Sequence, residues 1–260
     1  YCKSRFSFKY DPKMALKTIL HYSPNFNFKK RTYKKIKFIV IHYTGMKKES
    51  DAVNRLTSIQ SEVSSHYLIK NNGNILTLVP DLYEAWHAGK SSWKNYKSLN
   101  QNSIGIEIIN PGHKFGYKRF SKKQISSLLK LNKFLIKKYK ISPKNILGHS
   151  DIAPDRKKDP GEKFPWEYLS KNNIGLWHSL KKKRLMKNRN FKTSKIEKEL
   201  FFNNLFKIGY SNKTPKELGK NKYLKNLIKA FQRRFRQEMI NGIIDQECLL
   251  ISKDLIKKYN

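Results

Sequence analysis

The chain has 260 residues, with 56 lysines and arginines against 19 aspartates and glutamates, which gives a formal charge of +37. Because 38% of the residues are hydrophobic and 13% aromatic, the chain carries enough apolar material for a packed core, which excludes a charge-rich disordered chain. No apolar run approaches the ~20 residues that a membrane-spanning helix needs. The two cysteines, Cys2 and Cys248, are too few for a disulfide-dense scaffold or a Cys-rich zinc module, and only one bridge between the two ends stays open.

The first 34 residues mix aromatic residues, proline and lysine without a clear period, and they predict an extended lead-in. Because the chain starts with Tyr1 rather than Met, we expect that a leader such as a signal peptide was removed. Cys2 leaves a lipid anchor open, although Tyr1 is a poor fit for the small residue that precedes such a cysteine.

Residues 36–42 (I-K-F-I-V-I-H) form a short run of mostly β-branched apolar residues, which predicts a buried strand that ends at His42. Ser50, followed by apolar residues at helical spacing, predicts a capped amphipathic helix. The runs 66–70 and 75–79 are separated by N-N-G-N and predict a β-hairpin.

Residues 103–109 (S-I-G-I-E-I-I) predict a further strand. In it Ile104, Ile106 and Ile108 share one face, which leaves Gly105 and Glu107 on the other. Ser121 and Gln124 form a capping box at the start of a helix that reaches about Lys140. Strands that alternate with helices indicate an α/β domain, with a central mixed sheet flanked by helices, over residues 35–180.

A charge-rich segment with few apolar residues, 181–195, predicts a basic linker, and a helical module follows over 196–260. In that module, Thr214-Pro215-Lys216-Glu217 is a capping box with proline at the first helical position. A module of roughly 65 residues is near the lower limit for folding alone. We expect its removal to leave the function of the larger domain largely intact, unless the module packs on that domain and supports it.

The chain has seven histidines, and an isolated histidine is more often a structural or surface residue than a metal ligand. We favour that role for His21, His113 and His178. His42 and His149 differ because each ends or follows an apolar run, where a sheet edge meets a loop. Asp159 follows ten residues after His149. Two imidazoles and one carboxylate are a standard ligand set for catalytic Zn²⁺, which leaves a fourth position for water.

Five motifs carry a family resemblance at these residues: V-I-H-Y-T-G (40–45), S-H-Y-L-I (65–69), A-W-H-A-G (85–89), S-I-G-I-E (103–107) and G-H-S-D-I-A-P-D-R-K-K-D-P-G-E-K-F-P-W (148–166). Together they resemble the zinc-dependent N-acetylmuramoyl-L-alanine amidases, which have the peptidoglycan-recognition-protein fold. Residues 205–259 resemble the C-terminal peptidoglycan-binding-like module of the periplasmic or outer-membrane branch.

The resemblance implies roles for individual residues. It implies that His42, His149 and Asp159 bind Zn²⁺, that Glu107 is the catalytic acid and base, and that Lys157 is the catalytic lysine. These roles agree with the chemistry, because zinc lowers the pKa of its bound water to about 7 and polarises a carbonyl. A carboxylate can then move the proton to the leaving nitrogen, and an ammonium can stabilise the oxyanion.

Substrate contacts are expected from the same motifs. The resemblance points to Tyr43 after the first ligand, and to Trp86, His87 and Ala88 in the stem-peptide groove, although Trp86 could equally pack in the core. Lys70 lies where the family often has a basic residue that faces a substrate carboxylate. His66 is expected to be structural rather than a ligand.

The resulting expectation is an enzyme that hydrolyses the amide between the lactyl group of N-acetylmuramic acid and L-alanine. The alternative is a non-catalytic peptidoglycan-recognition protein of the same fold. A nucleic-acid binder is disfavoured because the charge is spread along the chain and lysine outnumbers arginine 46 to 10. We expect a monomer in the periplasm or at the outer membrane of a Gram-negative bacterium rather than in the cytoplasm, without a transmembrane segment, while peripheral or lipid-anchored membrane association stays open. Intact sacculus, released muropeptide and anhydro-muropeptide all remain candidate substrates.

Overall fold

The computed structural model describes residues 16–210 and 221–259. At its centre lies a six-stranded mixed sheet in the order β1-β5-β4-β9-β3-β10, in which every neighbouring pair is parallel except β4 and β5. The strands are β1 (Ile19–Leu20), β3 (Phe38–Tyr43), β4 (Tyr67–Ile69), β5 (Ile75–Thr77), β9 (Ser103–Ile108) and β10 (Ile146–Gly148). Two small antiparallel pairs accompany the sheet: β2 (Phe26–Asn27) with β6 (Glu84–Ala85), and β7 (Ser92–Trp93) with β8 (Tyr96–Lys97).

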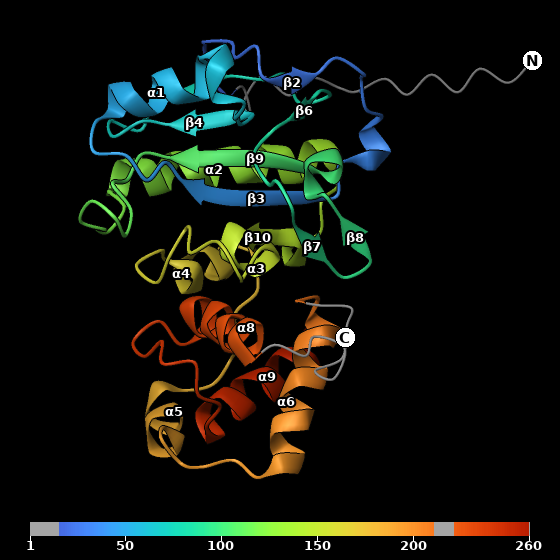
Figure 1. Ribbon diagram of the computed structural model, residues 1–260, viewed down its shortest axis with the longest axis vertical. Helices are drawn as coiled ribbons and strands as arrows, with labels where there is room; N and C mark the ends of the chain where they lie inside the picture. The colour runs from blue at the N-terminus through green and yellow to red at the C-terminus, as the bar shows by residue number, and fades with distance from the viewer. Residues whose placement is uncertain (1–15, 211–220, 260) are drawn as a thin grey trace, which may run out of the picture.

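Helices cover both sides of the sheet, which confirms the predicted fold class (Figure 1). They are α1 (Glu49–Thr57), α2 (Lys122–Tyr139), α3 (His149–Ile152), α4 (Trp166–Lys171), α5 (Lys182–Asn188), α6 (Lys195–Ile208), α8 (Asn221–Phe235) and α9 (Gln246–Tyr259). Single 3₁₀ turns lie at Tyr33–Lys35, Ile59–Ser61, Leu99–Asn102 and Pro143–Asn145. Within the described residues, no helix combines the length and the apolar character that crossing a membrane requires.

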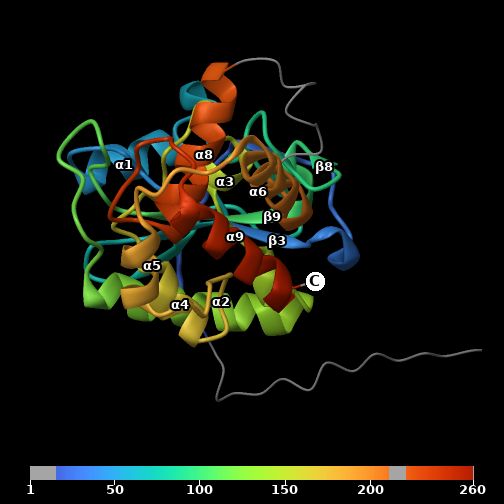
Figure 2. The same ribbon diagram turned by 90° about the horizontal axis from the view of Figure 1, so that it is seen from below.

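The alternation of side chains along β3 and β9 divides the core into two sides. The odd-numbered Ile39 and Ile41 of β3 share a cluster with the three isoleucines of β9, and α2 and α4 close that cluster. On the other side, α1 packs over β4 and β5, and α3 lies against β3. Figure 2 shows α2 on one side of β3 and β9 with α1 and α3 on the other. The register sets His42 beside Glu107 on this second side.

Local sequence signals account for most of these elements. Ser121 and Gln124 form the predicted capping box at the start of α2, and β4 and β5 form the predicted hairpin. The helix after Ser50 is also present, but Ser50 is not its cap. The N-cap is Lys48, with no side-chain hydrogen bond, so the helix begins before the serine.

The segment predicted as a basic linker, 181–195, is largely exposed but contains a short helix and contacts the core at two points. It contains α5, whose Leu185 is buried in the core, and it continues to Arg189, whose Nε donates to Glu247 Oε2 at 2.7 Å. Thr193 Oγ1 then donates to the carbonyl of Ile244 at 2.9 Å. The tertiary contacts outweigh the like charges that suggested a linker.

The N-terminal lead-in also belongs to the fold from residue 16 onward. β1 extends the main sheet, β2 pairs with β6, and the buried Arg31 donates to the carbonyl oxygens of Asn100 and Ser103 at 2.7 and 2.8 Å. Tyr1, Cys2 and the capping box at 214–217 lie outside the described residues.

The C-terminal helices share one apolar core with the sheet. The cluster runs from Phe38, Val40 and Leu147 of the sheet through Ile152 of α3 to Phe231 and other residues of α6, α8 and α9. Figure 1 shows these helices grouped beside the β10 edge. The predicted helical module is therefore packed against the sheet, and Cys248 within it is a buried free thiol.

Candidate metal centre and active site

Three elements bring His42, His149 and Asp159 together. β3 and β10 are adjacent parallel strands, so His42 near the end of β3 and His149 directly after β10 lie at the same edge of the sheet. Asp159 lies on the loop after α3, which is tied back to α3 by a hydrogen bond from the Ser150 amide to the Asp159 carbonyl at 2.8 Å. Gly148 permits this approach, because a Cβ there would lie 2.7 Å from Pro160 Cδ.

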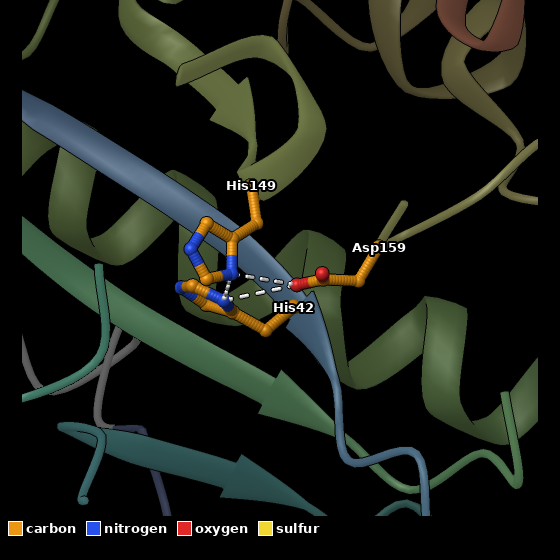
Figure 3. A group of neighbouring side chains, drawn as sticks. All are labelled: His42, His149 and Asp159. Atoms are coloured by element: carbon orange, nitrogen blue, oxygen red, sulfur yellow. Dashed lines mark hydrogen bonds and ion pairs between the residues drawn. The ribbon is translucent and has the colours of Figure 1, made fainter. Parts of the chain in front are cut away.

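The donor atoms of the three residues converge on one point (Figure 3). His42 Nδ1 lies 2.8 Å from His149 Nδ1, and Asp159 Oδ2 lies 3.1 and 3.0 Å from these two nitrogens. All three residues are buried. Ligands of one tetrahedral zinc ion, each at 2.0–2.1 Å from it, lie about 3.3 Å apart. The spacing and the donor set therefore fit a single Zn²⁺.

Each histidine has a partner for its second ring nitrogen, which leaves Nδ1 for a metal. His149 Nε2 lies 3.2 Å from the carbonyl of Ala88. His42 Nε2 lies 3.0 Å from His87 Nδ1, and His87 Nε2 lies 3.2 Å from Ser103 Oγ. Gly105 makes room for the His87 ring, because a Cβ there would lie 2.4 Å from His87 Cγ. This contact explains the glycine in the S-I-G-I-E motif.

Burial and charge set the ionisation of the cluster. Burial, reinforced by His149, lowers the pKa of His42 to about 4, so this imidazole is neutral as a metal ligand must be. Burial opposes ionisation of Asp159, but its contacts with His149 and His42 outweigh that effect and hold the pKa of this carboxyl far below its usual range. The site therefore offers a neutral imidazole at His42 and an anionic oxygen at Asp159, with His149 Nδ1 as the third donor.

Glu107 lies beside this cluster on β9, in register with His42. Burial and the nearby Asp159 carboxylate, opposed by Lys157, raise the pKa of Glu107 to about 8. Its Oε2 is buried and has no hydrogen-bond partner in the described part of the chain. A carboxyl group with a pKa near neutrality and a free oxygen is suited to accept and return a proton.

A cavity of about 520 Å³ opens over these residues, and we refer to it as the catalytic cavity. His42, His149, Asp159, Glu107 and Lys157 all line it, so the structure brings together every residue that the sequence assigned to metal binding or catalysis. Of the five predicted substrate-binding residues, Tyr43 and His87 also line it.

The remaining three predicted substrate contacts are not part of this lining. Lys70 pairs with Glu49, with 3.0 Å between Nζ and Oε1. The indole nitrogen of Trp86 donates to Asn27 Oδ1 at 3.0 Å. Ala88 is fully buried, and its carbonyl faces His149 and Arg156 rather than the cavity. His87 reaches the cavity, but both of its ring nitrogens contact other side chains.

Several residues of the cavity wall were not assigned to the site from the sequence, among them His113 and Arg156. His113 Nδ1 lies 2.8 Å from the Tyr43 hydroxyl oxygen, and its Nε2 lies 3.0 Å from Glu162 Oε2. Arg156 donates to the carbonyls of Ala88 and Lys90 at 2.5 and 2.6 Å and so fixes the loop that carries Asp159. The position of His113 after the carboxyl end of β9 was the available signal, because ligands bind at this edge of parallel strands.

Comparison with known proteins decides the family. Residues 32–162 match the family described as N-acetylmuramoyl-L-alanine amidase. The chain is 36% identical over 242 residues to N-acetylmuramoyl-L-alanine amidase AmiD of Escherichia coli (strain K12), a match that covers 87% of this chain and 84% of AmiD. The chain belongs to the N-acetylmuramoyl-L-alanine amidase family. It hydrolyses the amide bond between N-acetylmuramic acid and L-alanine in peptidoglycan or its fragments.

Two solved structures extend the comparison. The structure of E. coli AmiD in complex with anhydro-N-acetylmuramic acid-L-Ala-D-gamma-Glu-L-Lys superposes with a TM-score of 0.75 at 37% identity, over 88% of this chain and 91% of that one. AmpDh3 of Pseudomonas aeruginosa gives a TM-score of 0.75 at 31% identity, over 91% of this chain and 97% of that one. Both likenesses extend well beyond residues 32–162, so this amidase shares its C-terminal helices with these relatives.

Proposed function

We propose that this amidase is a zinc enzyme in which His42, His149 and Asp159 hold the metal and Glu107 moves the proton. The observation that carries the proposal is the convergence of three buried metal-binding atoms beside a carboxylate with a free oxygen, at the base of one cavity. When bound, zinc supplies Lewis-acid polarisation of the carbonyl and activation of water at neutral pH.

The protein's own side chains account for the rest of the reaction. Glu107 takes a proton from the attacking water as the new carbon–oxygen bond forms, and it gives a proton to the leaving nitrogen as the carbon–nitrogen bond breaks. The products are the lactyl carboxylic acid and a free amine. Lys157 lines the same cavity and offers a positive charge to the oxyanion of the tetrahedral intermediate. His87 and Ala88 hold the two imidazoles in position through their second ring nitrogens.

Replacement of Glu107 by alanine tests this assignment. We expect Glu107→Ala to retain bound zinc and the native melting temperature while kcat falls at least about a hundredfold, the usual scale for a general acid and base. Glu167→Ala is the matched control, because Glu167 is an exposed carboxylate that pairs with Lys171. Near-normal turnover in Glu107→Ala would remove Glu107 from the mechanism.

We further propose that anhydro-muropeptides are among the substrates. Support comes from two relatives, because the AmiD structure holds an anhydromuramyl tripeptide and an AmpDh3 structure holds an anhydromuramic pentapeptide. Digestion of purified anhydro-muropeptide and of insoluble sacculi by the same enzyme preparation, followed by chromatography of the released peptides, tests this choice. Release from sacculi alone would contradict it.

We also propose that the enzyme acts in the periplasm or at the outer membrane. Support comes from the charge of +37, which attracts a polyanionic wall. Fractionation of the native host with detection by antibody tests the location. Recovery only with the cytoplasmic fraction would exclude it.

A further inference from the structure

A second cavity of about 510 Å³ adjoins the catalytic cavity, and α8 of the C-terminal helices forms one of its walls. We call it the α8 cavity. The two cavities share His113, Arg156, Lys157 and Lys158, which lie on the strip of surface between them. Since the cavities meet along this strip, a substrate whose reacting bond lies beside Glu107 can extend into the α8 cavity.

The lining of the α8 cavity is strongly basic. It contains five basic side chains against two carboxylates: Arg156, Lys157, Lys158, Lys229 and Arg233 against Asp155 and Glu162. The guanidinium of Arg156 already donates hydrogen bonds to backbone carbonyls. Lys229 lies on α8 and is half-buried. An excess of positive charge in a concave site favours an anionic ligand.

Arg233 is the residue that distinguishes this cavity from an ordinary basic surface. Its side chain is 8% exposed, and its Nε is buried without a hydrogen-bond partner among the residues described. The nearest carboxylate, Glu162, is 3.8 Å from that Nε, and it already contacts His113 at 3.0 Å. A buried cation without hydrogen bonds is costly, which implies that a ligand completes its interactions.

The two neighbouring arginines show the contrast. Arg234 is buried and pairs with Asp151, and it also donates to the carbonyl of Ile146 at 3.0 Å. Arg236 is buried and pairs with Asp245. In the sequence R-R-F-R, Arg234 and Arg236 each pair closely with a buried carboxylate, whereas the carboxylate that pairs with Arg233 in the cavity wall lies 3.8 Å away, beyond hydrogen-bond distance.

We propose that the α8 cavity is an anion subsite that takes a carboxylate of the substrate's stem peptide, with Arg233 as its main partner and Lys229 beside it. The inference rests on the proposed function, because the peptide begins at the amide that Glu107 serves. Stem peptides carry free carboxylates, and a planar guanidinium can bind a carboxylate through two parallel hydrogen bonds. The C-terminal helices thereby contribute directly to substrate specificity.

Kinetics with two matched muropeptides tests the subsite. One has free carboxyl groups in the stem peptide, and the other carries carboxamides at the same positions. We expect the ratio of kcat/KM for the acid to that for the amide to fall about tenfold in Arg233→Gln, mainly through KM, because a hydrogen-bonded ion pair is lost. Lys225→Gln is the control, since Lys225 is an exposed cation of α8 outside the lining and should keep the wild-type ratio.

Equilibrium binding of the same two compounds to the Glu107→Ala enzyme, with and without Arg233→Gln, measures the effect without turnover. The proposal is overturned if Arg233→Gln leaves the acid-to-amide ratio unchanged, or if Lys225→Gln lowers that ratio equally. If Arg233→Gln fails to fold, the same comparison of the acid and the amide is made with Lys229→Gln, which should lower the ratio as well. A site that serves phosphate-bearing polymers would bind inorganic phosphate and ignore the carboxamide change, which also overturns the proposal. Failure of the wild-type enzyme to hydrolyse either compound would instead contradict the proposed function.

Discussion

The second nitrogen of each histidine in the metal site has a defined partner, and this determines which nitrogen can bind zinc. For His42 Nδ1 to bind a metal, its proton must be on Nε2, where His87 Nδ1 accepts it. The proton on His87 Nε2 then points to Ser103 Oγ, whose hydroxyl donates to the carbonyl of Leu99 at 2.6 Å. The chain of hydrogen bonds ends at the backbone and sets every tautomer along it.

We therefore predict that His87 orients a metal ligand. Replacement of His87 by alanine should weaken zinc binding by about 10- to 100-fold, the range for loss of such a supporting contact. Competition with a coloured chelator measures the affinity, and the melting temperature of the metal-free variant reports any general loss of structure. Unchanged zinc affinity in His87→Ala would show that His42 keeps its orientation without this partner.

The raised pKa of Glu107 predicts a pH effect on stability in the metal-free enzyme. The folded protein holds the proton of Glu107 up to about pH 8, whereas the unfolded chain releases it near the ordinary glutamate pKa of 4.5. Because the unfolded state binds fewer protons within this window, the contribution of Glu107 to stability is lost as the pH rises through it. The melting temperature of Glu107→Gln relative to wild type should rise from about pH 5 to about pH 8, measured in chelator. A pH-independent difference would mean that Glu107 is ionised throughout.

At the scale of residues, the sequence predicted the metal ligands and the proton-transfer residue better than it predicted the residues that surround them. His42, His149, Asp159 and Glu107 stand in local motifs that reveal strand ends and donor types. Arg233 could not be found in this way, because its significance depends on the absence of a partner, and that is decided by packing between segments far apart in the chain.

At the scale of elements, α8 holds α3 in place through Asp151. This carboxylate is buried, receives the Tyr210 hydroxyl at 2.7 Å, and pairs with Arg234 of α8. Asp151 also accepts a hydrogen bond from the Gly148 amide at 2.8 Å, at the start of the helix whose first residue is His149. A helix of the C-terminal part thus stabilises the turn that presents a metal ligand.

Loss of this ion pair should be costly. Arg234→Ala leaves the buried Asp151 without its counter-charge, and such a change destabilises proteins by about 3–5 kcal/mol. Lys225→Ala removes an equal charge from the exposed face of α8 and should have little effect. Urea unfolding of the three proteins measures the difference. A loss below about 1 kcal/mol in Arg234→Ala would show that water or a rearranged neighbour replaces the arginine.

The elements that sequence analysis missed have little local signal. β1 and β2 have two residues each, too few to show a period of two. α5 has seven residues, of which only Leu185 is buried, so its charges dominated the pattern. In contrast, α2 has 18 residues with a full capping box and a continuous apolar face, and its start and end were predicted closely.

At the scale of the molecule, the continuous core contradicts the idea of a dispensable C-terminal module. Residues of α6, α8 and α9 pack in one cluster with Phe38, Val40 and Leu147 of the sheet. We predict that a chain ending near Lys187 is insoluble or lacks a cooperative thermal transition, because truncation exposes this apolar surface and the charge of Asp151. Circular dichroism and hydrolysis of a soluble muropeptide check the outcome. A truncated protein that melts cooperatively and retains turnover would show that the sheet is stable alone.

Zinc content measured in parallel with turnover tests the central claim most directly. We predict about one zinc per chain in the purified wild-type enzyme, loss of both zinc and muropeptide hydrolysis after chelation, and recovery of both when zinc is returned. His149→Ala should lose most of its zinc and its activity, because it removes one of three converging donors. Full turnover by the metal-free enzyme, or stoichiometric zinc with full turnover in His149→Ala, would contradict the account.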